Sequence, residues 1–260
     1  MIQSALYREP VLVDSVLHRH KKLLPLTDFS IAGGMHAVFI TATEFPQAAL
    51  DFPLVFINVG DAGASADATQ ADRTLLTPIA LLGLSAYENL HVDNGRWTGR
   101  YVPAFIRRFP FIAAAVDGAD APGVFVDAGW PGFNDTAGEP LFTEDGKPAE
   151  TLTRAMEFLE RFEQEAQRTR QFCARLAELD LLKEMQADAT LPTGDVVRVD
   201  GFLAVDETKL LALPDAVVLE LHRNGILTLL HAHLMSLANL RYLVQRKADR
   251  ETAKAAPVAT

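Results

Sequence analysis

The segment from Glu150 to Leu179 constrains the fold of this chain most, because its apolar residues recur every three or four positions. That spacing places them on one side of a long helix, and the other side carries charges of both signs. Such a helix must bury its apolar stripe against other elements of the chain. The stripe consists of Leu152, Met156, Leu159, Phe162, Ala166, Thr169, Phe172, Cys173, Leu176 and Leu179.

Cys173, the only cysteine, lies in this stripe. One cysteine excludes an intramolecular disulfide and a Cys-rich zinc site, and an activated thiolate needs an electropositive, partly exposed setting. We therefore expect a buried thiol that packs. A lone thiol fits a reducing compartment, and the N-terminus has no apolar run of signal-peptide length. The expected location is cytoplasmic, and surface association would need a non-classical route.

The first half of the chain contains short segments that are rich in β-branched and aromatic residues and bounded by turn residues. With the long helix, they predict an α+β fold. A central antiparallel or mixed sheet from the first half is packed by the amphipathic helix, and a smaller, mostly helical lobe follows. The predicted strands are His36–Thr43, Leu54–Val59, Ile79–Leu84, Leu90–Val92, Ile112–Val116 and Val124–Val126, with a turn at Asp93-Asn94-Gly95.

Composition divides the chain into a main domain over residues 1–194, a small C-terminal lobe over 195–245 packed on it, and a disordered tail over 246–260. The lobe begins with a predicted hairpin, Val196–Val205, that turns at Asp200-Gly201. A short helix near Asp206 follows, and then a helix over Ala216–Gln245 with a break at Asn224-Gly225. The Ala/Asp-rich stretch Gly60–Ala71 is predicted as a loop.

Charge limits the partners. The chain has 34 acidic and 24 basic residues, a net charge of −10 and a pI of about 5.2. A nucleic-acid duplex or an anionic bilayer would repel most of that surface, so no nucleic-acid partner is expected. The apolar stretch Ile226–Leu240 is shorter than the roughly 20 residues of a membrane-spanning helix, so no transmembrane segment is expected either.

The usual catalytic and cofactor motifs are absent from the sequence. It has no Gly-x-Ser-x-Gly elbow, no P-loop and no dinucleotide-binding glycine motif. His231 and His233 stand two positions apart, which on a helix points one toward the core and the other toward solvent, so they cannot share an ion. The His18–Lys22 run reads as an exposed basic segment. We expect no metal site and no cofactor, and no catalytic residue is identified.

The segment Asp93–Phe111 (DNGRWTGRYVPAFIRRFPF) has the most unusual composition, because arginines alternate with aromatic residues in an acidic chain. Guanidinium groups bind carboxylates or phosphates and stack on rings, which favours a site for an anionic metabolite or a partner. Alternatively, the segment is structural, with a short helix over Tyr101–Arg108 whose arginines pair with carboxylates elsewhere. The candidate ligand-binding residues are Arg96, Trp97, Arg100, Tyr101, Arg107 and Arg108.

The same segment is part of a resemblance to a known family. Together with Gly138–Phe162 (GEPLFTEDGKPAETLTRAMEFLERF), Leu213–Leu243 and LTDFSIAGG near the start, Glu88–Phe111 strongly resembles the bacterial SapC family. The blocks stand in the family's order and extend from about Leu23 to Leu243.

The resemblance implies little about chemistry. The family is named after a surface-layer-associated protein, and members are often encoded beside TonB-dependent receptors, tryptophan-halogenase-like flavoproteins and cupin-type hydroxylases. It implies no catalytic residue. The leading hypothesis is an accessory or binding protein without identifiable catalytic machinery, which would bind a protein partner or a small anionic ligand. An enzyme or ligand sensor that uses the Arg/aromatic segment, and a surface-layer component, are the alternatives.

Overall fold

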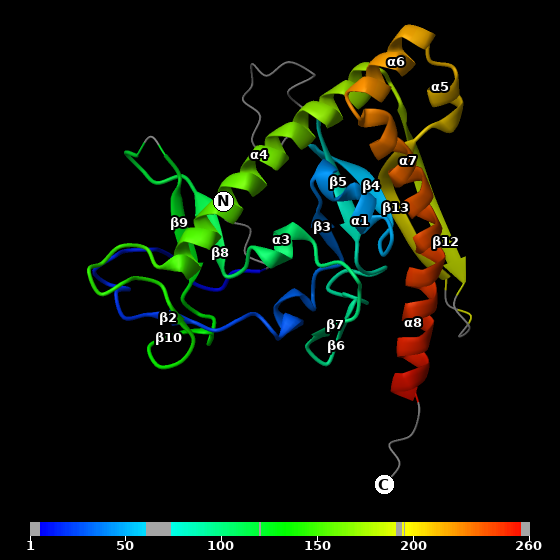
Figure 1. The fold of residues 1–260 in the computed structure, drawn as a ribbon. Coiled ribbons are helices and arrows are strands. Elements are labelled where there is room, and N and C mark those ends of the chain that lie inside the picture. Colours follow the sequence, from blue (N-terminus) through cyan, green and yellow to red (C-terminus); the bar gives the residue numbers. More distant parts are fainter. Residues whose placement is uncertain (1–5, 61–73, 120, 191–193, 195, 256–260) are drawn as a thin grey trace. The chain divides into compact units, whose positions relative to one another are not determined.

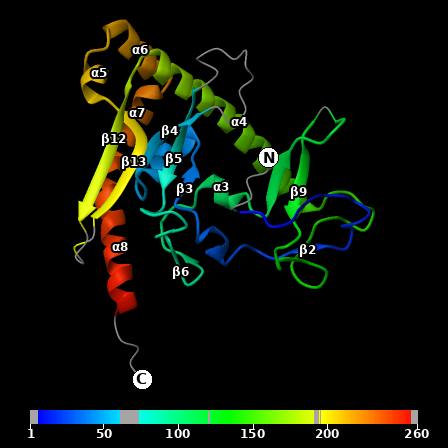
Figure 2. The ribbon, with the colours of Figure 1, turned by 180° about the vertical axis from the view of Figure 1, so that it is seen from behind.

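The computed structural model describes residues 6–60, 74–119, 121–190, 194 and 196–255, so nearly all of the predicted loop Gly60–Ala71 lies outside the described residues. The chain divides into two compact units, and its helices and strands are shown in Figures 1 and 2. Unit 1 comprises Met1–Ala32, Val92–Trp97 and Ala104–Gln164. Unit 2 comprises Gly33–His91, Thr98–Pro103 and Glu165–Thr260. These units differ from the division at residue 194 expected from composition. The predicted α+β class is confirmed.

Unit 1 contains small antiparallel sheets. In one, β9 (Gly123–Asp127) lies between β1 (Pro10–Leu12) and β8 (Phe111–Ala114). In another, β2 (Lys22–Leu23) lies between β10 (Phe133–Asn134) and β11 (Glu139–Pro140). The strands β6 (Val92–Asp93) and β7 (Arg96–Trp97) form the predicted hairpin. Its turn residues Asn94 and Gly95 have φ angles of 47° and 77°, as a tight hairpin turn requires. The remaining short elements are η1 (Phe29–Ala32) and α3 (Ala104–Arg107).

The helix α4 (Glu150–Glu178) confirms the strongest sequence prediction and ends one residue earlier than expected. In unit 1, its side chains Leu152 and Leu159 are buried in one apolar cluster with Phe111 and Leu141. In unit 2, Phe172 packs edge-on against Phe45, with ring centroids 5.8 Å apart. Most of the predicted stripe is therefore buried, whereas its member Met156 is 44% exposed.

Unit 2 is built on an antiparallel five-stranded sheet with the order β12-β13-β4-β5-β3. Three of its strands come from the first half of the chain, as predicted, and two follow α4. The strands are β3 (Ala37–Phe39), β4 (Leu54–Gly60), β5 (Thr74–Leu81), β12 (Leu182–Thr190) and β13 (Val196–Val205). Between β3 and β4 lie the short helices η2 (Ala42–Glu44) and α1 (Phe45–Ala48).

The predicted hairpin at Val196–Val205 is wrong, because this whole segment is the single strand β13. Asp200-Gly201 forms a bulge: Met185 pairs with Phe202 and Ala187 with Val199, so two residues of β13 face one of β12. Gly201 takes a φ of 76°, which glycine adopts without strain. Asp-Gly therefore bends the strand without reversing it.

The C-terminal region is helical. Its elements are α5 (Glu207–Leu211), α6 (Asp215–Arg223), α7 (Ile226–Ser236), η3 (Leu237–Asn239) and α8 (Leu240–Ala255). The predicted break at Asn224-Gly225 is confirmed, since Gly225 has a φ of 81° between α6 and α7. In Figure 1, α7 and α8 follow one another in orange and red, and α7 contacts β4 and β13.

The disorder predicted from residue 246 onward is corrected by α8, which continues to Ala255. Side chains of this part of the helix are held by unit 2. The ammonium of Lys247 lies 3.0 Å from a carboxylate oxygen of Glu88, and Arg250 donates to the carbonyl of Asn89 at 2.9 Å. The polar, Ala-rich composition of this segment predicts disorder, but the contacts of Lys247 and Arg250 stabilise it as a helix. None of the helices over the described residues is long and apolar enough to cross a bilayer.

Two histidines are buried in unit 2. As expected for their spacing, His233 is buried and His231 is exposed. The Nε2 of His233 accepts the N–H of Val205 at 3.0 Å, and its ring packs on Phe56 at 5.1 Å. His91 packs on Phe52 at 4.7 Å. Burial lowers the pKa of each of the two buried imidazoles, His233 and His91, to about 4, so both are neutral in the native state at neutral pH.

These lowered pKa values predict how stability depends on pH. Between about pH 6.5 and 4, the unfolded chain binds protons at His91 and His233 that the folded chain does not bind, so the free energy of unfolding falls as the pH falls. Above this window neither histidine changes it. Each histidine contributes a loss of roughly 3 kcal/mol across the window. Chemical unfolding followed by far-UV circular dichroism at a series of pH values measures this loss.

The variant His233→Gln provides the control, because its amide oxygen still accepts the Val205 N–H but does not titrate. We expect its stability to fall with a slope smaller by about one proton across the window. A slope equal to that of the wild type would contradict the role of His233.

Candidate functional site

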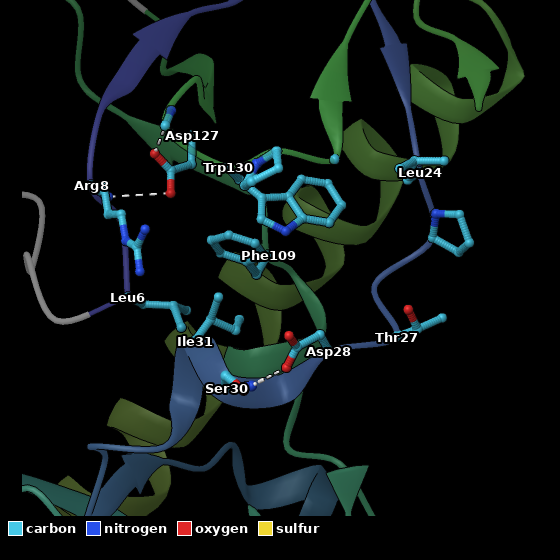
Figure 3. A pocket seen from close by; sticks show the side chains of 14 residues that line it. Leu6, Arg8, Leu24, Thr27, Asp28, Ser30, Ile31, Phe109, Asp127 and Trp130 are labelled. Atoms are coloured by element: carbon cyan, nitrogen blue, oxygen red, sulfur yellow. Dashed lines mark hydrogen bonds between the residues drawn. The ribbon is translucent and has the colours of Figure 1, made fainter. Parts of the chain in front are cut away.

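A cavity of about 490 Å³ in unit 1 is the candidate binding site. Three separate parts of unit 1 form it: the N-terminal segment before β1, the loop after β2 together with η1, and the end of β9 with the turn that follows it. Phe109, which follows α3, completes the wall (Figure 3). The lining residues are Leu6, Arg8, Leu24, Pro25, Thr27, Asp28, Ser30, Ile31, Phe109, Asp127, Gly129, Trp130, Pro131 and Gly132.

Aromatic rings form one wall of the cavity. Phe109 meets Trp130 edge-on, with ring centroids 5.4 Å apart, and Tyr7 packs on Phe109 at 5.7 Å. The Tyr7 hydroxyl donates to the carbonyl of Phe111 at 2.8 Å, and burial raises the pKa of Tyr7 to about 12. Tyr7 therefore supports Phe109 as a neutral group and does not act as an acid or base near neutral pH.

The position of Trp130 depends on a glycine. A Cβ atom at residue 132 would lie 2.2 Å from the Cη2 atom of the Trp130 indole. This separation is too short for any side chain, so the ring lies directly over Gly132. The sequence Gly-Trp-Pro-Gly thus places a large aromatic surface against a position that only glycine accommodates.

Asp127 fixes the N-terminal segment at the cavity. Its carboxylate is buried and accepts three backbone N–H groups, from Glu9 at 2.7 Å and from Arg8 and Gly129 at 3.2 Å each. A carboxylate that is occupied in this way stabilises the backbone around it. Asp127 is therefore a positioning residue and has little capacity left to bind a ligand.

Besides Asp127, two charged side chains line the cavity. Asp28 is exposed and accepts the N–H of Ser30 at 2.8 Å, and hydrogen bonds from Ser30 lower the pKa of Asp28, which keeps it ionised. The guanidinium of Arg8 is also exposed and makes no hydrogen bond or ion pair with any residue that the structure describes. In Figure 3 Arg8 lies to the left of Phe109, and Asp28 lies below it. The cavity thus offers an aromatic surface, one available cation and, besides the buried Asp127, one exposed anion.

The six residues predicted from the Arg/aromatic segment fall into both units, and none lines this cavity. In unit 1, Arg96 is exposed on β7, and Trp97 packs on Phe29 at 5.8 Å. The guanidinium of Arg107 lies 5.4 Å from the Phe158 ring, and that of Arg108 lies 3.9 Å from the Phe105 ring.

In unit 2, Arg100 and Tyr101 share one carboxylate. The Nε of Arg100 and the backbone N–H of Tyr101 donate to Asp51 at 3.0 and 2.8 Å. Arg100 also donates to the carbonyl of Leu50 at 2.6 Å, and the Tyr101 hydroxyl donates to Glu44 at 2.8 Å. These contacts tie the two residues to the start of unit 2, as the structural interpretation of the segment expects. Whether the segment also binds a ligand stays a prediction.

Other reactive groups have structural settings. Cys173 is buried, as predicted, and burial raises its pKa to about 12, so the thiolate is not available near neutral pH. Within the described part of the chain, no three His, Cys, Asp or Glu side chains are grouped closely enough to hold a metal ion.

Comparison with known families supports the resemblance found in the sequence. The SapC family profile matches residues 13–243 of the 260 residues. The chain belongs to the SapC family. Within this SapC-family chain, the cavity residues from Leu24 onward lie inside the matched range, whereas Leu6 and Arg8 precede it. Comparisons with curated proteins and with solved structures gave no significant match.

The hydrogen bonds of Asp127 predict a stability effect. Asp127→Ala leaves three backbone N–H groups without their acceptor, so we expect the free energy of unfolding of unit 1 to fall by about 3 kcal/mol. Both tryptophans, Trp97 and Trp130, lie in unit 1, so tryptophan fluorescence during urea unfolding reports on this unit.

The matched control is Asp135→Ala. Asp135 also belongs to unit 1, but its side chain is 65% exposed and forms a surface ion pair with Lys21. We expect a loss of less than about 1 kcal/mol. Equal losses in the two variants would contradict the positioning role of Asp127.

Proposed function

We propose that this SapC-family chain is a binding or accessory protein that holds a small organic anion in the unit 1 cavity. The observation that supports this proposal most is the combination of an aromatic wall, formed by the edge-on rings of Phe109 and Trp130, with the available guanidinium of Arg8. The volume of the cavity, about 490 Å³, falls within the roughly 300–1,000 Å³ that is typical of small-molecule sites. Arg8 would bind a carboxylate in the bidentate manner that guanidinium favours.

The charges of the cavity narrow the class of ligand. Asp28 is ionised at the same cavity and would repel a ligand that carries several negative charges. A monocarboxylate with a flat or apolar body fits better, because the body contacts the aromatic wall and the single charge pairs with Arg8.

The lining groups suit recognition better than reaction. Asp127 is occupied by backbone donors. Tyr7, which packs on Phe109 and is not itself a lining residue, has a raised pKa that makes it a poor proton donor or acceptor near neutral pH. We therefore propose an accessory role. The chain would pass its ligand to another protein, or it would bind a protein partner and regulate it. An association with surface-layer, TonB-receptor, halogenase or hydroxylase systems belongs to this proposal and rests on the family resemblance.

The alternative proposal places an anionic metabolite at the Arg/aromatic segment, in a binding protein or an enzyme. Its support is that Arg107 and Arg108 lie over aromatic rings and that Arg107 is exposed. Against it, Arg100 is already occupied by Asp51. The two proposals differ in which arginine the ligand needs.

Phenylacetate is the probe that tests both proposals, because it joins one carboxylate to one ring. A ligand that binds only the native chain stabilises it by about 2.7 kcal/mol at a hundredfold excess over Kd. We expect the thermal midpoint, followed by tryptophan fluorescence, to rise by roughly 5 °C at that excess. Arg8→Gln should abolish the rise, and Arg107→Gln should not.

The matched cation phenethylamine is the ligand control, and it should give a smaller rise because it loses the contact with Arg8. Loss of the phenylacetate response in Arg107→Gln alone would move the site to the Arg/aromatic segment. If phenylacetate leaves the midpoint of the wild type unchanged, the proposed class of ligand is wrong.

A further inference from the structure

A second feature of unit 1 is the turn between β1 and β2, which exposes two aliphatic side chains. Val16 is 80% exposed and its neighbour Leu17 is 78% exposed. The turn is held in place by Asp14, whose Oδ1 accepts the N–H groups of Val16 and Leu17 at 2.8 Å each. The backbone N–H of Asp14 in turn donates to Nδ1 of His18 at 3.0 Å. The two apolar side chains are therefore presented on a hydrogen-bonded turn.

A basic cavity immediately follows this turn in the chain. It has a volume of about 660 Å³, and three basic side chains, Arg19, His20 and Lys22, contribute to its lining. Arg19 donates to the backbone carbonyl of Glu144, and the ammonium of Lys22 donates to that of Thr136 at 3.3 Å. Neither forms an ion pair with a carboxylate of the described residues, although Arg19 is close enough to Asp145 to help lower the pKa of that carboxyl. Lys22 keeps an uncompensated charge.

We propose that this turn is an anchor for an anionic membrane surface. Val16 and Leu17 enter the interfacial zone of the bilayer, and Arg19 and Lys22 bind the phosphates of the lipid headgroups. Apolar side chains at the tip of a loop with basic residues beside them satisfy both requirements of interfacial binding, burial of apolar area and attraction to anionic lipid.

A bilayer fits this surface better than a protein partner does. A stable protein interface buries about 800 Å² on each side around an apolar centre. Two aliphatic side chains on a turn are too few for such a centre. They are enough to contribute to interfacial binding, in which apolar burial and electrostatic attraction add together.

The acidic character of the chain limits the strength of this binding. The net charge is −10, and near the turn Glu144 lines the basic cavity and Asp135 pairs with Lys21 at 2.9 Å. At physiological salt, charges further than about 8 Å away are largely screened, so the charges beside the turn decide the strength of binding. Arg19 and Lys22 attract the lipid phosphates, and the carboxylates of Asp14, Glu144 and Asp145 oppose that attraction. We therefore expect reversible binding that weakens as salt increases.

Co-sedimentation of the full chain with vesicles tests the anchor. We expect binding to vesicles of equal parts phosphatidylcholine and phosphatidylglycerol, and little binding to phosphatidylcholine alone. Arg19→Gln with Lys22→Gln should weaken partitioning roughly thirtyfold, because each basic residue near an anionic surface contributes a factor of about five. Val16→Ser with Leu17→Ser should also weaken it, by about tenfold.

Matched control variants lie in unit 2. Arg223→Gln with Arg241→Gln removes two exposed positive charges, and Leu211→Ser removes an aliphatic side chain that is 86% exposed. Both should bind anionic vesicles like the wild type. Circular dichroism confirms that each variant is folded, and release of the wild type by high salt is a second measurement that needs no variant.

Three results would overturn the anchor. They are no binding of the wild type to anionic vesicles, equal binding to neutral and anionic vesicles, and equal losses in the turn variants and their controls. Binding of the turn to an acidic protein without binding to vesicles would also reject the bilayer as its partner.

Discussion

The apolar stripe of α4 is the constraint on which both units depend. One uninterrupted helix supplies Leu152 and Leu159 to the core of unit 1, and Phe172 and Leu176 are buried in unit 2. The Thr169 hydroxyl also accepts the N–H of Ala42, the first residue of η2, at 2.9 Å. The first part of α4 therefore contributes buried apolar side chains to unit 1 and the second part contributes them to unit 2, as an amphipathic helix does when its apolar face is covered.

Periodicity could predict α4 because its signal is local and repeated many times. The β6–β7 hairpin is predictable for a similar reason, since Asn94 and Gly95 carry the turn chemistry themselves. The pairing of β12 with β13 could not be predicted in this way. The sequence of β12 has many polar residues, and it forms a strand because it pairs with β13. Asp200-Gly201 carries a turn signal that the sheet converts into a bulge, and sequence alone does not distinguish these outcomes.

The candidate cavity could not be predicted from the sequence for a similar reason. Arg/aromatic composition drew attention to a single stretch of sequence, and Phe109 from that stretch does line the cavity. The other walls come from residues more than 75 positions earlier and from the turn around Trp130, and only the fold brings these segments together. The available signal was Gly129-Trp130-Pro131-Gly132, in which a large ring stands between two glycines. Glycine and proline at these positions favour a turn, and only the structure shows that Trp130 lies against Gly132 and faces the cavity.

The distribution of charge explains why the two proposed sites are both in unit 1. In unit 2, two basic side chains form ion pairs between elements: Arg175 of α4 pairs with Glu220 at 2.7 Å, and Lys247 of α8 pairs with Glu88 at 3.0 Å. In unit 1, Arg8 and Lys22 lie at cavities and have no carboxylate partner among the described residues. In a chain with ten excess negative charges, carboxylates are abundant, so a cation kept free of them at a cavity is available to an anion from outside.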